Sequence, residues 1–451
     1  MTTGTVIFQV TAIGTNPRAL ETTVESVRYW IRRTPGFRHR ALVWLVVEPE
    51  GYATAPSLYE AWRASGIEVW IVPTGYRTPL GTRGKARALQ YACDLRSARG
   101  LDGPEVWVYH QDEETCVGED TLRGIAEFIE RRRELLGAGI ILYPLDWMPI
   151  PSHVQEFTRS YDDLRVLDSL TMPGNPTAGF HGSHFVVRAD VEGAVGWDAE
   201  GYCPAEDLLF EIRVRARFGS VFGILKGFAY EKGAFTLRDQ LRQRRRWIRG
   251  ITYAVRTSRV LSSRRRLTIS YSAISWYSAL PSAVVLVASA VLHYGSLLLF
   301  TSFFSGFVWI SMAAGYIEGA RLHRSYMDRP PGALRLFAYG LVGALVDVLA
   351  PWYGLVTGTH LTDFIRKDPI PYRVTTAAPT VPRPTPTVTP AIGPDRSFPA
   401  TVCRGCGGSL SRAERRFYAV AGTDVEEPKC RNCLGHQEWV RFAPHARPVP
   451  G

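Results

Sequence analysis

The sequence predicts an α/β domain on a mainly parallel sheet, then apolar helices of membrane-spanning length, then a small cysteine module. Three observations support this prediction. Residues 1–235 alternate short apolar runs with helical stretches. Three long apolar segments follow between residues 271 and 357, and two Cys-x-x-Cys pairs lie near the C-terminus. With 451 residues, the chain is long enough for two or three structural units.

Six short apolar runs in residues 1–235 are predicted as strands. They are Val6–Val10, Leu42–Val47, Ile67–Val72, Val106–His110, Ile140–Tyr143 and Phe185–Val187. Between the early runs, Arg18–Ile31 and Lys85–Leu95 show the helical spacing of apolar positions that a crossover helix needs. Near-continuous apolar strands that alternate with helices indicate a mainly parallel sheet covered on both faces. Ligands of such sheets bind at the carboxyl ends of the strands.

The positive charge of the chain is concentrated before the first apolar segment. Lys and Arg number 53 against 42 acidic residues, a formal net charge of +11. Between Arg238 and Arg266 there are eleven arginines and a single acid, Asp239. This placement favours an anionic membrane surface over nucleic acid as the partner. We expect residues 236–266 to form a basic amphipathic interfacial region, and nucleic acid is not an expected partner.

Residues 267–368 are predicted as the membrane region. Tyr271–Leu292 and Gly295–Ile317 are uncharged and long enough to span a bilayer, and the short gap between them favours a hairpin. A buried core helix is the alternative for any one such segment. The third segment, Leu336–Thr357, contains Asp347 and a proline. An acid facing lipid is costly, so we expect this segment to be re-entrant or interfacial.

The N-terminus begins a strand pattern and does not resemble a signal peptide, so the first domain is expected in the cytoplasm. Four arginines between residues 318 and 335 suit the cytoplasmic side of a hairpin. We therefore expect an integral membrane protein with a cytoplasmic catalytic domain, in the plasma membrane if the source is prokaryotic.

A Pro/Thr-rich linker at residues 369–400 leads to a predicted zinc-ribbon-like module at residues 401–451. Its four cysteines, in two pairs separated by 23 residues, are Cys403, Cys406, Cys430 and Cys433. Each pair can direct two thiolates at one ion, which predicts a structural Zn²⁺ site. Two disulfides or a redox pair are the alternative. Thiolates need a reducing compartment, so this module is expected on the cytoplasmic side, where it contacts a protein partner, a second copy or the catalytic domain.

The scattered cysteines have a simpler interpretation. Cys93, Cys116 and Cys203 stand apart from one another in the sequence. We expect them to be reduced packing residues rather than ligands.

Acidic side chains follow the fourth predicted strand. Asp112-Glu113-Glu114 lies at a strand end, where Asp112 and Glu114 could bind Mg²⁺ or Mn²⁺. Such an ion can neutralise the charge that develops on a diphosphate leaving group. The alternative is a solvated helix start, which Thr115 and Gly118 also fit.

Two further acids precede the helical run at residues 208–218. Glu206 or Asp207 could take the proton of an attacking hydroxyl group. The alternative is that both acids simply favour a helix N-terminus through the helix dipole.

Two basic motifs could contact phosphate. Gln243-Arg244-Arg245-Arg246-Trp247 offers Arg246 to a diphosphate and Trp247 as an apolar platform for a sugar or acceptor. An amphipathic interfacial helix is the alternative, although it requires neither Gln243 nor Trp247. Gly81–Arg87 precedes a predicted helix, where backbone amides and Lys85 could face phosphate. Glycine and basic residues before a helix are common.

The order and spacing of these motifs resemble those of glycosyltransferase family 2, and within it those of the egghead-type β-1,4-mannosyltransferases. The stretches that carry the resemblance are Gly84–Tyr91, His110–Thr115, Gly182–Val187, Ala205–Asp207, Tyr230–Lys232, Gln243–Trp247 and Trp352–Val356. The resemblance covers about residues 5–368. It implies the Rossmann-like GT-A fold and a metal-dependent inverting hexosyltransferase that uses a nucleotide sugar. The implied donor is GDP-mannose, with UDP-glucose as the alternative, and the implied acceptor is a glycolipid.

The resemblance also implies a role for each matching residue. Asp112, Glu113 and Glu114 would hold the metal and diphosphate, and Asp207 would be the base with Glu206 beside it. The residues implied at the nucleotide are Glu48 and Lys85, and those implied at the diphosphate and acceptor are Gly182, Ser183, His184, Gln243, Arg246 and Trp247.

The chain departs from the family pattern in three respects. The usual metal motif is Asp-x-Asp, and Glu114 stands at its third position. Animal egghead proteins carry N-terminal transmembrane segments, so membrane attachment is here expected to rest on residues after Arg238. The C-terminal cysteine module is not part of the resemblance.

Two other functions remain open from the sequence. A processive polysaccharide synthase of the cellulose or hyaluronan synthase type shares the Gln-x-x-Arg-Trp motif. A non-catalytic membrane scaffold could act through the zinc module. We favour a non-processive transferase with a lipid-linked acceptor at the cytoplasmic face, because two or three apolar segments are few for a polysaccharide pore.

Overall fold

The computed structural model describes most of the first 357 residues. The described ranges are 4–14, 16–131, 133–143, 181–234, 236–258, 262–292 and 332–357, with the short pieces 156–157, 159–160, 163, 299, 302–303, 310, 313–321 and 323. The predicted linker and the four cysteines of the predicted zinc module lie outside the described residues, and so does most of Gly295–Ile317.

One eight-stranded sheet forms the centre of the N-terminal half. Its strands are β1 (Thr5–Ala12), β2 (Arg40–Val47), β3 (Glu68–Ile71), β4 (Val106–Asp112), β5 (Cys116–Val117), β6 (Leu136–Leu142), β7 (Phe185–Arg188) and β8 (Phe222–Tyr230). They lie in the order β3-β2-β1-β4-β7-β6-β8-β5. Strands β3, β2, β1 and β4 are parallel to one another, so their carboxyl ends meet at one edge.

The predicted strands are found, and the sheet is mainly parallel but mixed, because six of its eight strands run in one direction. Each of the six predicted runs overlaps a strand. However, β7 runs antiparallel to both β4 and β6, and β5 runs antiparallel to β8. The apolar pattern shows which residues are buried and gives no strand direction, which is why the two reversed strands were not predicted. Strand β8 was missed because Gly223, Lys226 and Gly227 interrupt its apolar run.

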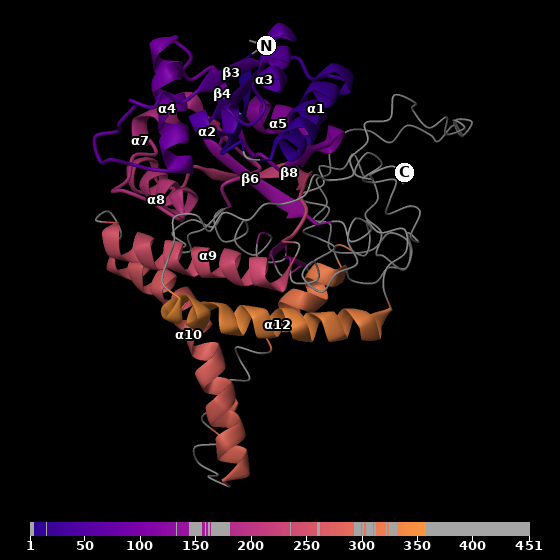
Figure 1. The fold of residues 1–451 in the computed structure, drawn as a ribbon, viewed down its shortest axis with the longest axis vertical. Coiled ribbons are helices and arrows are strands. Elements are labelled where there is room, and N and C mark those ends of the chain that lie inside the picture. The colour runs from indigo at the N-terminus through magenta and orange to yellow at the C-terminus, as the bar shows by residue number, and fades with distance from the viewer. Residues whose placement is uncertain are drawn as a thin grey trace, which may run out of the picture.

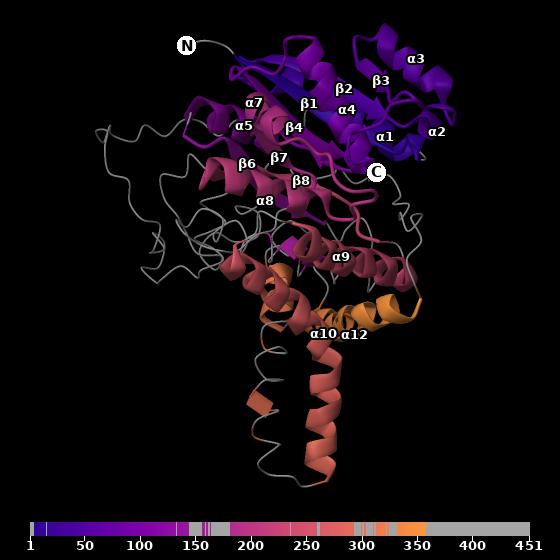
Figure 2. The same cartoon turned by 90° about the vertical axis from the view of Figure 1, so that its left-hand side faces the viewer.

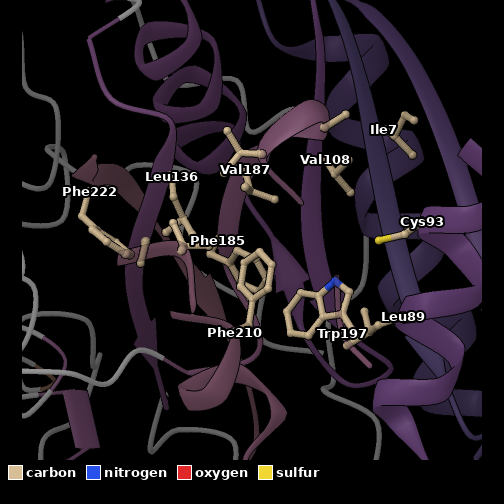
Figure 3. Close-up of a cluster of buried hydrophobic side chains, with 14 of the residues drawn as sticks. Ile7, Leu89, Cys93, Val108, Leu136, Phe185, Val187, Trp197, Phe210 and Phe222 are labelled. Atoms are coloured by element: carbon tan, nitrogen blue, oxygen red, sulfur yellow. The ribbon is translucent and has the colours of Figure 1, made fainter. Parts of the chain in front are cut away.

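Helices cover both faces of the sheet. They are α1 (Pro17–Arg33), α2 (Pro49–Tyr52), α3 (Pro56–Ala64), α4 (Lys85–Ala98), α5 (Glu119–Arg131), α7 (Ala189–Val195) and α8 (Glu206–Phe218). Helices α1 and α5 pack on the face that carries Phe8 and Tyr109. Helices α4, α7 and α8 pack on the opposite face, around Ile7, Val108 and Phe185 (Figure 3). Side chains therefore alternate between the faces along each strand.

Helix α1 shows how the local sequence sets an element. The Asn16 side chain accepts a hydrogen bond from the Ala19 N–H at 3.4 Å, and proline occupies the first helical position. Both features favour a helix start at this point. The buried face of the helix carries Leu20, Val24 and Val27. Its N-terminus is thereby fixed beside the carboxyl ends of β1 and β4.

Three long helices lie beyond the sheet. They are α9 (Leu237–Thr257), α10 (Ser263–Val291) and α12 (Ala333–Val356). Helix α12 packs along α9, and the C-terminal part of α10 extends away from the rest of the molecule, across the direction of α12 (Figures 1 and 2). Among the described residues, Leu334–Val356 is the one helix long and apolar enough to cross a membrane, and Trp276–Val291 is a shorter apolar helix.

Helix α5 packs so closely against β8 that only glycine fits at position 124. A Cβ atom at Gly124 would lie 1.7 Å from the backbone oxygen of Lys226. We predict that Gly124→Ala lowers the free energy of unfolding by about 2 kcal/mol or more, because the backbones must separate. Gly193→Ala is the matched control, since a Cβ there meets nothing within 4 Å. Urea unfolding measures both, and equal stability of the two variants would contradict the packing.

Candidate active site

The parallel half of the sheet directs polar residues to one edge. Asp112 ends β4 and pairs in register with Thr11 of β1, and Glu48 follows the last residue of β2. Helix α4 begins at Lys85 and α8 begins at Glu206. Four elements thus bring charged side chains to the carboxyl ends of the strands, where the sequence predicts a ligand.

Lys85 is surrounded by acids. Its Nζ atom forms an ion pair with the carboxylate of Asp112 and lies 3.5 Å from Oε1 of Glu206. It also donates a hydrogen bond of 2.9 Å to the carbonyl oxygen of Gly182. A Cβ atom at Gly182 would lie 2.9 Å from this ammonium group and 3.2 Å from Oδ2 of Asp207. Asp207 therefore faces the same small volume.

The charged groups in this cluster shift each other's pKa values. Burial by itself lowers the pKa of Lys85, but Asp112, Glu206 and Asp207 outweigh it and raise the pKa above its ordinary value. Lys85 is therefore a permanent cation at neutral pH. Burial raises the pKa of Glu206, and the neighbouring charge of Lys85 opposes that shift. The two residues depend on each other for their charged forms.

Glu48 lies beside a residue that the sequence interpretation missed. Nη1 of Arg87 lies 2.6 Å from Oε2 of Glu48, and Arg87 also donates to the carbonyl oxygen of Pro73 at 2.7 Å. Burial raises the pKa of Glu48, and Arg87 counteracts this. Oε1 of Glu48 has no hydrogen-bond partner among the described residues. Arg87 is two residues after Lys85 in the predicted basic stretch, and its pairing with Glu48, 39 residues away, gives no local sequence signal.

Glu113 turns away from the Lys85 cluster. Its Oε2 atom accepts a hydrogen bond of 3.0 Å from the Gly14 N–H, and its carbonyl oxygen accepts one from Thr23 at 3.0 Å. Glu113 therefore joins the end of β1 and helix α1 to the end of β4. Glu114 is partly buried in the turn that follows Asp112.

A buried hydrogen-bond chain supports Asp112 from behind. The Asp112 N–H donates to Oγ of Ser183 at 3.3 Å, and Ser183 lies 2.7 Å from Oγ1 of Thr115. Thr115 in turn donates to Oε1 of Glu231 at 2.6 Å. Ser183, Thr115 and Glu231 are all buried, so this chain fixes the backbone that presents Asp112. The sequence interpretation assigned no role to Thr115 or Glu231.

His184 points into the core rather than toward the acids. It is fully buried, with Nδ1 2.8 Å from the Tyr109 hydroxyl and Nε2 3.2 Å from the carbonyl oxygen of Gly227. Its φ of 57° lies in the left-handed region, and the residue before it, Ser183, accepts the hydrogen bond from the Asp112 N–H. These three consecutive residues have different contacts. The carbonyl oxygen of Gly182 binds Lys85, and the hydroxyl group of Ser183 binds the backbone of Asp112. His184 links the start of β7 to β4 and β8.

The motif on α9 is mostly enclosed. Gln243, Arg244 and Arg245 are buried, whereas Arg246 and Trp247 are partly exposed. The guanidinium carbon of Arg244 lies 4.2 Å from the centroid of the Trp247 ring. Arg159 lies 5.0 Å from the same ring. Trp247 is thus packed by two cations. Arg246 is close enough to Glu206 to oppose the rise in the pKa of that acid.

Few side chains at this site could ligate a divalent ion. Within the described residues, no group of three or more His, Cys, Asp or Glu side chains is placed to bind a metal. Asp112 offers a carboxylate at a strand end that is 30% exposed, and Glu114 is two residues away. These oxygens suit Mg²⁺ or Mn²⁺, provided that a ligand such as a diphosphate supplies further oxygens.

The chain was compared with protein families and characterised proteins. A family described as glycosyl transferase family group 2 matches residues 107–317. The β-1,4-mannosyltransferase bre-3 of Caenorhabditis briggsae is 33% identical over 213 residues, covering 46% of this chain and 45% of that protein. The β-1,4-mannosyltransferase egh of Drosophila melanogaster is 30% identical over 318 residues, 66% of each chain.

Solved structures were compared as well. The mannosyltransferase PcManGT from Pyrobaculum calidifontis, in complex with GDP-Man and Mn²⁺, shares 17% identity with a TM-score of 0.45, covering 72% of this chain and 88% of that chain. TarS 1-349 of S. aureus, in complex with UDP-GlcNAc, shares 13% identity with a TM-score of 0.36, covering 77% and 90%.

The eight-stranded sheet with helices on both faces, and the acids at its carboxyl edge, define an α/β protein with a candidate ligand site at that edge. The chain belongs to glycosyltransferase family 2. It spans about half of the length of the bre-3 relative from Caenorhabditis briggsae and 66% of the Drosophila relative.

The buried position of His184 predicts an acid-sensitive fold. Burial lowers the pKa of His184 to about 3 from 6.5. The unfolded chain therefore binds the proton more readily, and stability is lost as the pH falls from about 6.5 toward 3. Between pH 7 and pH 5 we expect this histidine to cost about 2 kcal/mol of unfolding free energy.

His184→Gln is the test of this pH dependence, because a glutamine amide can still donate to the carbonyl oxygen of Gly227. Denaturant unfolding at pH 7 and pH 5 should show a smaller pH-dependent loss in the variant than in the wild type. An identical loss in both proteins would show that His184 does not remain neutral in the fold.

Proposed function

We propose that this protein is a metal-dependent inverting hexosyltransferase that transfers one sugar from a nucleotide sugar to a hydroxyl group of a lipid-linked acceptor. The observation that carries the proposal is the convergence of Asp112, Glu206 and Asp207 around Lys85 at the carboxyl edge of the sheet. Membership of glycosyltransferase family 2 supports this assignment.

GDP-mannose is the donor that we favour, with UDP-glucose as the alternative. The relatives of this chain are named as β-1,4-mannosyltransferases, which supports mannose. In our proposal the nucleoside lies at the end of β2, where Glu48 accepts an N–H of the base through Oε1 and Arg87 holds its other oxygen. Lys85 and the N-terminus of α4 lie where they favour the negative charge of the diphosphate.

Asp112 and Glu114 are the residues that would hold Mn²⁺ or Mg²⁺. When bound, the ion neutralises charge on the departing diphosphate. Ser183, Thr115 and Glu231 contribute by keeping the backbone of Asp112 in place. Glu113 contributes by linking the ends of β1 and β4, which form the floor of the site.

Asp207 is the proposed base. Its Oδ1 atom accepts a 2.8 Å hydrogen bond from the Leu208 N–H, which leaves Oδ2 directed toward Lys85 and Gly182. The acceptor hydroxyl gives its proton to this carboxylate, and its oxygen bonds to the anomeric carbon of the sugar. The bond from that carbon to the diphosphate oxygen breaks, and the electron pair leaves with the diphosphate. Attack from the opposite face inverts the configuration.

Residues of α9 complete the site in this proposal. Arg246, near Glu206, is placed to attract the diphosphate as it leaves. Gln243 is buried, with an amide oxygen that has no partner among the described residues. Trp247 contacts Arg159 and Arg244. In our proposal it holds these two cations beside the acceptor, and its ring also forms an apolar contact with the sugar.

We propose that α12 lies in the plane of the membrane surface and does not cross it. One face of this helix contacts α9, where Asp347 lies 3.1 Å from Nε of Arg244 and Arg249 donates to the carbonyl oxygen of Gly354 at 2.6 Å. The other face exposes a stripe of apolar side chains, which are Leu334, Phe337, Leu341, Leu345, Leu349 and Val356. An in-plane helix of this kind buries its apolar face among acyl chains.

In the same proposal the C-terminal module lies on the cytoplasmic side. We propose that residues 271–317 form a membrane hairpin and that the chain after α12 stays with the catalytic domain. Zn²⁺ bound by the four cysteines of residues 401–451 would then be in a reducing compartment. Its partner in this proposal is another protein, a second copy of the chain or the catalytic domain itself.

Replacing the proposed base tests the chemistry. We predict that Asp207→Asn lowers turnover by about 10²- to 10⁴-fold, because the amide cannot accept the proton. The assay is release of GDP from GDP-mannose with a lipid extract as acceptor, and calorimetry should show that GDP binding is retained. Asp190→Asn is the control, since Asp190 pairs with Arg188 at the other end of the sheet. Wild-type turnover in Asp207→Asn would reject the assignment.

Topology fusions test the orientation of α12. We predict that green fluorescent protein fused after residue 451 fluoresces in a bacterial host, because an even number of crossings returns the chain to the cytoplasm. Alkaline phosphatase fused after residue 294 should be active, since that point would be the tip of the hairpin. A dark fluorescent fusion together with active phosphatase at residue 451 would mean that α12 spans the bilayer.

A further inference from the structure

The Lys85 cluster contains more negative than positive charge. Three carboxylates, those of Asp112, Glu206 and Asp207, face one ammonium group in a small volume. Lys85 is the first residue of α4. Its side chain is only 18% exposed. The ammonium group therefore keeps these acids together, and Arg246 adds a second positive charge near Glu206.

The position of the ammonium group is fixed by contacts on several sides. It pairs with Asp112 at the end of β4, lies 3.5 Å from Glu206 on α8, and donates to the carbonyl oxygen of Gly182 at 2.9 Å. Any side chain at Gly182 would lie within 2.9 Å of it. Lys85 thus contacts the same carboxylate of Asp112 that we assign to the divalent ion.

A divalent ion bound to the oxygen of Asp112 that pairs with Lys85 would lie beside the ammonium group, and these two cations would repel each other. The cluster is only partly exposed, with Asp112 30% and Glu206 13% accessible, so solvent screens these charges incompletely. A diphosphate would change this balance, because its oxygens can accept hydrogen bonds from the ammonium group and also ligate the divalent ion. The flexible four-carbon stem of lysine allows the short movement that is needed.

We propose that Lys85 is a resident counter-ion that competes with the divalent cation for Asp112 and transfers its ion pair to the diphosphate when the donor binds. This inference rests on the proposed function. It means that the ion and the nucleoside diphosphate enter the site together, and that the site binds the free ion poorly. The same lysine thereby protects the acids from metal in the absence of donor and holds the leaving group in its presence.

Binding of Mn²⁺ to the full-length protein tests this proposal without an activity assay. The free Mn²⁺ signal in electron paramagnetic resonance is measured during titration of the wild type and of Lys85→Gln. Without GDP, the variant should bind Mn²⁺ at least about tenfold more tightly, because the competing cation is gone. With GDP, the wild type should tighten strongly and the variant much less.

Lys226→Gln is the matched control. Lys226 pairs with Glu127 at 2.7 Å on the far strand β8, so its replacement removes the same charge away from the cluster. Its Mn²⁺ affinity should equal that of the wild type. Lys85→Met is prepared in parallel, and thermal melting identifies which variants are folded. Equal or weaker Mn²⁺ binding by a folded Lys85 variant in the absence of GDP would overturn the proposal.

A measurement on the wild type avoids any variant that fails to fold. Acylation of Lys85 by an amine reagent is followed by mass spectrometry, with and without saturating Mn²⁺. Displacement from Asp112 should raise the labelling rate of Lys85 and leave that of Lys226 unchanged. An unchanged rate for Lys85 with Mn²⁺ bound would also overturn the proposal. Failure of the proposed function itself would be distinct, because Mn²⁺ would then not bind to the wild type even with GDP.

Discussion

The site depends on one electrostatic constraint, which is the position of a single ammonium group among three carboxylates. Lys85 keeps its charge because Asp112, Glu206 and Asp207 surround it, and burial raises the pKa of Glu206 where Lys85 opposes the shift. The charged forms of Lys85 and Glu206 therefore stabilise each other. The chemistry that we propose uses this balance, since a diphosphate and a divalent ion together can replace the pairing.

The fold creates this constraint through the sheet. The parallel strands β1, β2 and β4 end in register, and the N-termini of α4 and α8 lie at the same edge. The buried chain from Ser183 through Thr115 to Glu231 then fixes the strand end that carries Asp112. The segment that leads into the antiparallel strand β7 supplies Ser183, so the mixed character of the sheet contributes to the site.

Apolar runs in the sequence were enough to locate six strands, because burial imposes period-two or near-continuous patterns. Of the helices that cover the sheet, α1, α4 and α8 were predicted. Strand direction could not be predicted, since β7 has the same composition in either orientation. The acids Asp112, Glu206 and Asp207 were identified from their places after a strand and before a helix. Arg87, Thr115 and Glu231 were missed, because their roles arise from pairings between residues far apart in the chain.

The arginine-rich helix α9 connects the catalytic domain with α12. Arg244 and Arg249 contact α12, whereas Arg246 of the same helix acts on Glu206. The proposed membrane surface and the proposed acceptor side of the site therefore share one element, which suits the lipid-linked acceptor that we propose.

The central claim is that Asp112 binds a divalent ion together with a nucleoside diphosphate. Isothermal titration calorimetry of GDP into the wild type and Asp112→Asn, each with and without Mn²⁺, tests it most directly. The account predicts that Mn²⁺ tightens GDP binding at least about tenfold in the wild type and has little effect in the variant. Equal GDP affinity with and without Mn²⁺ in the wild type would contradict it.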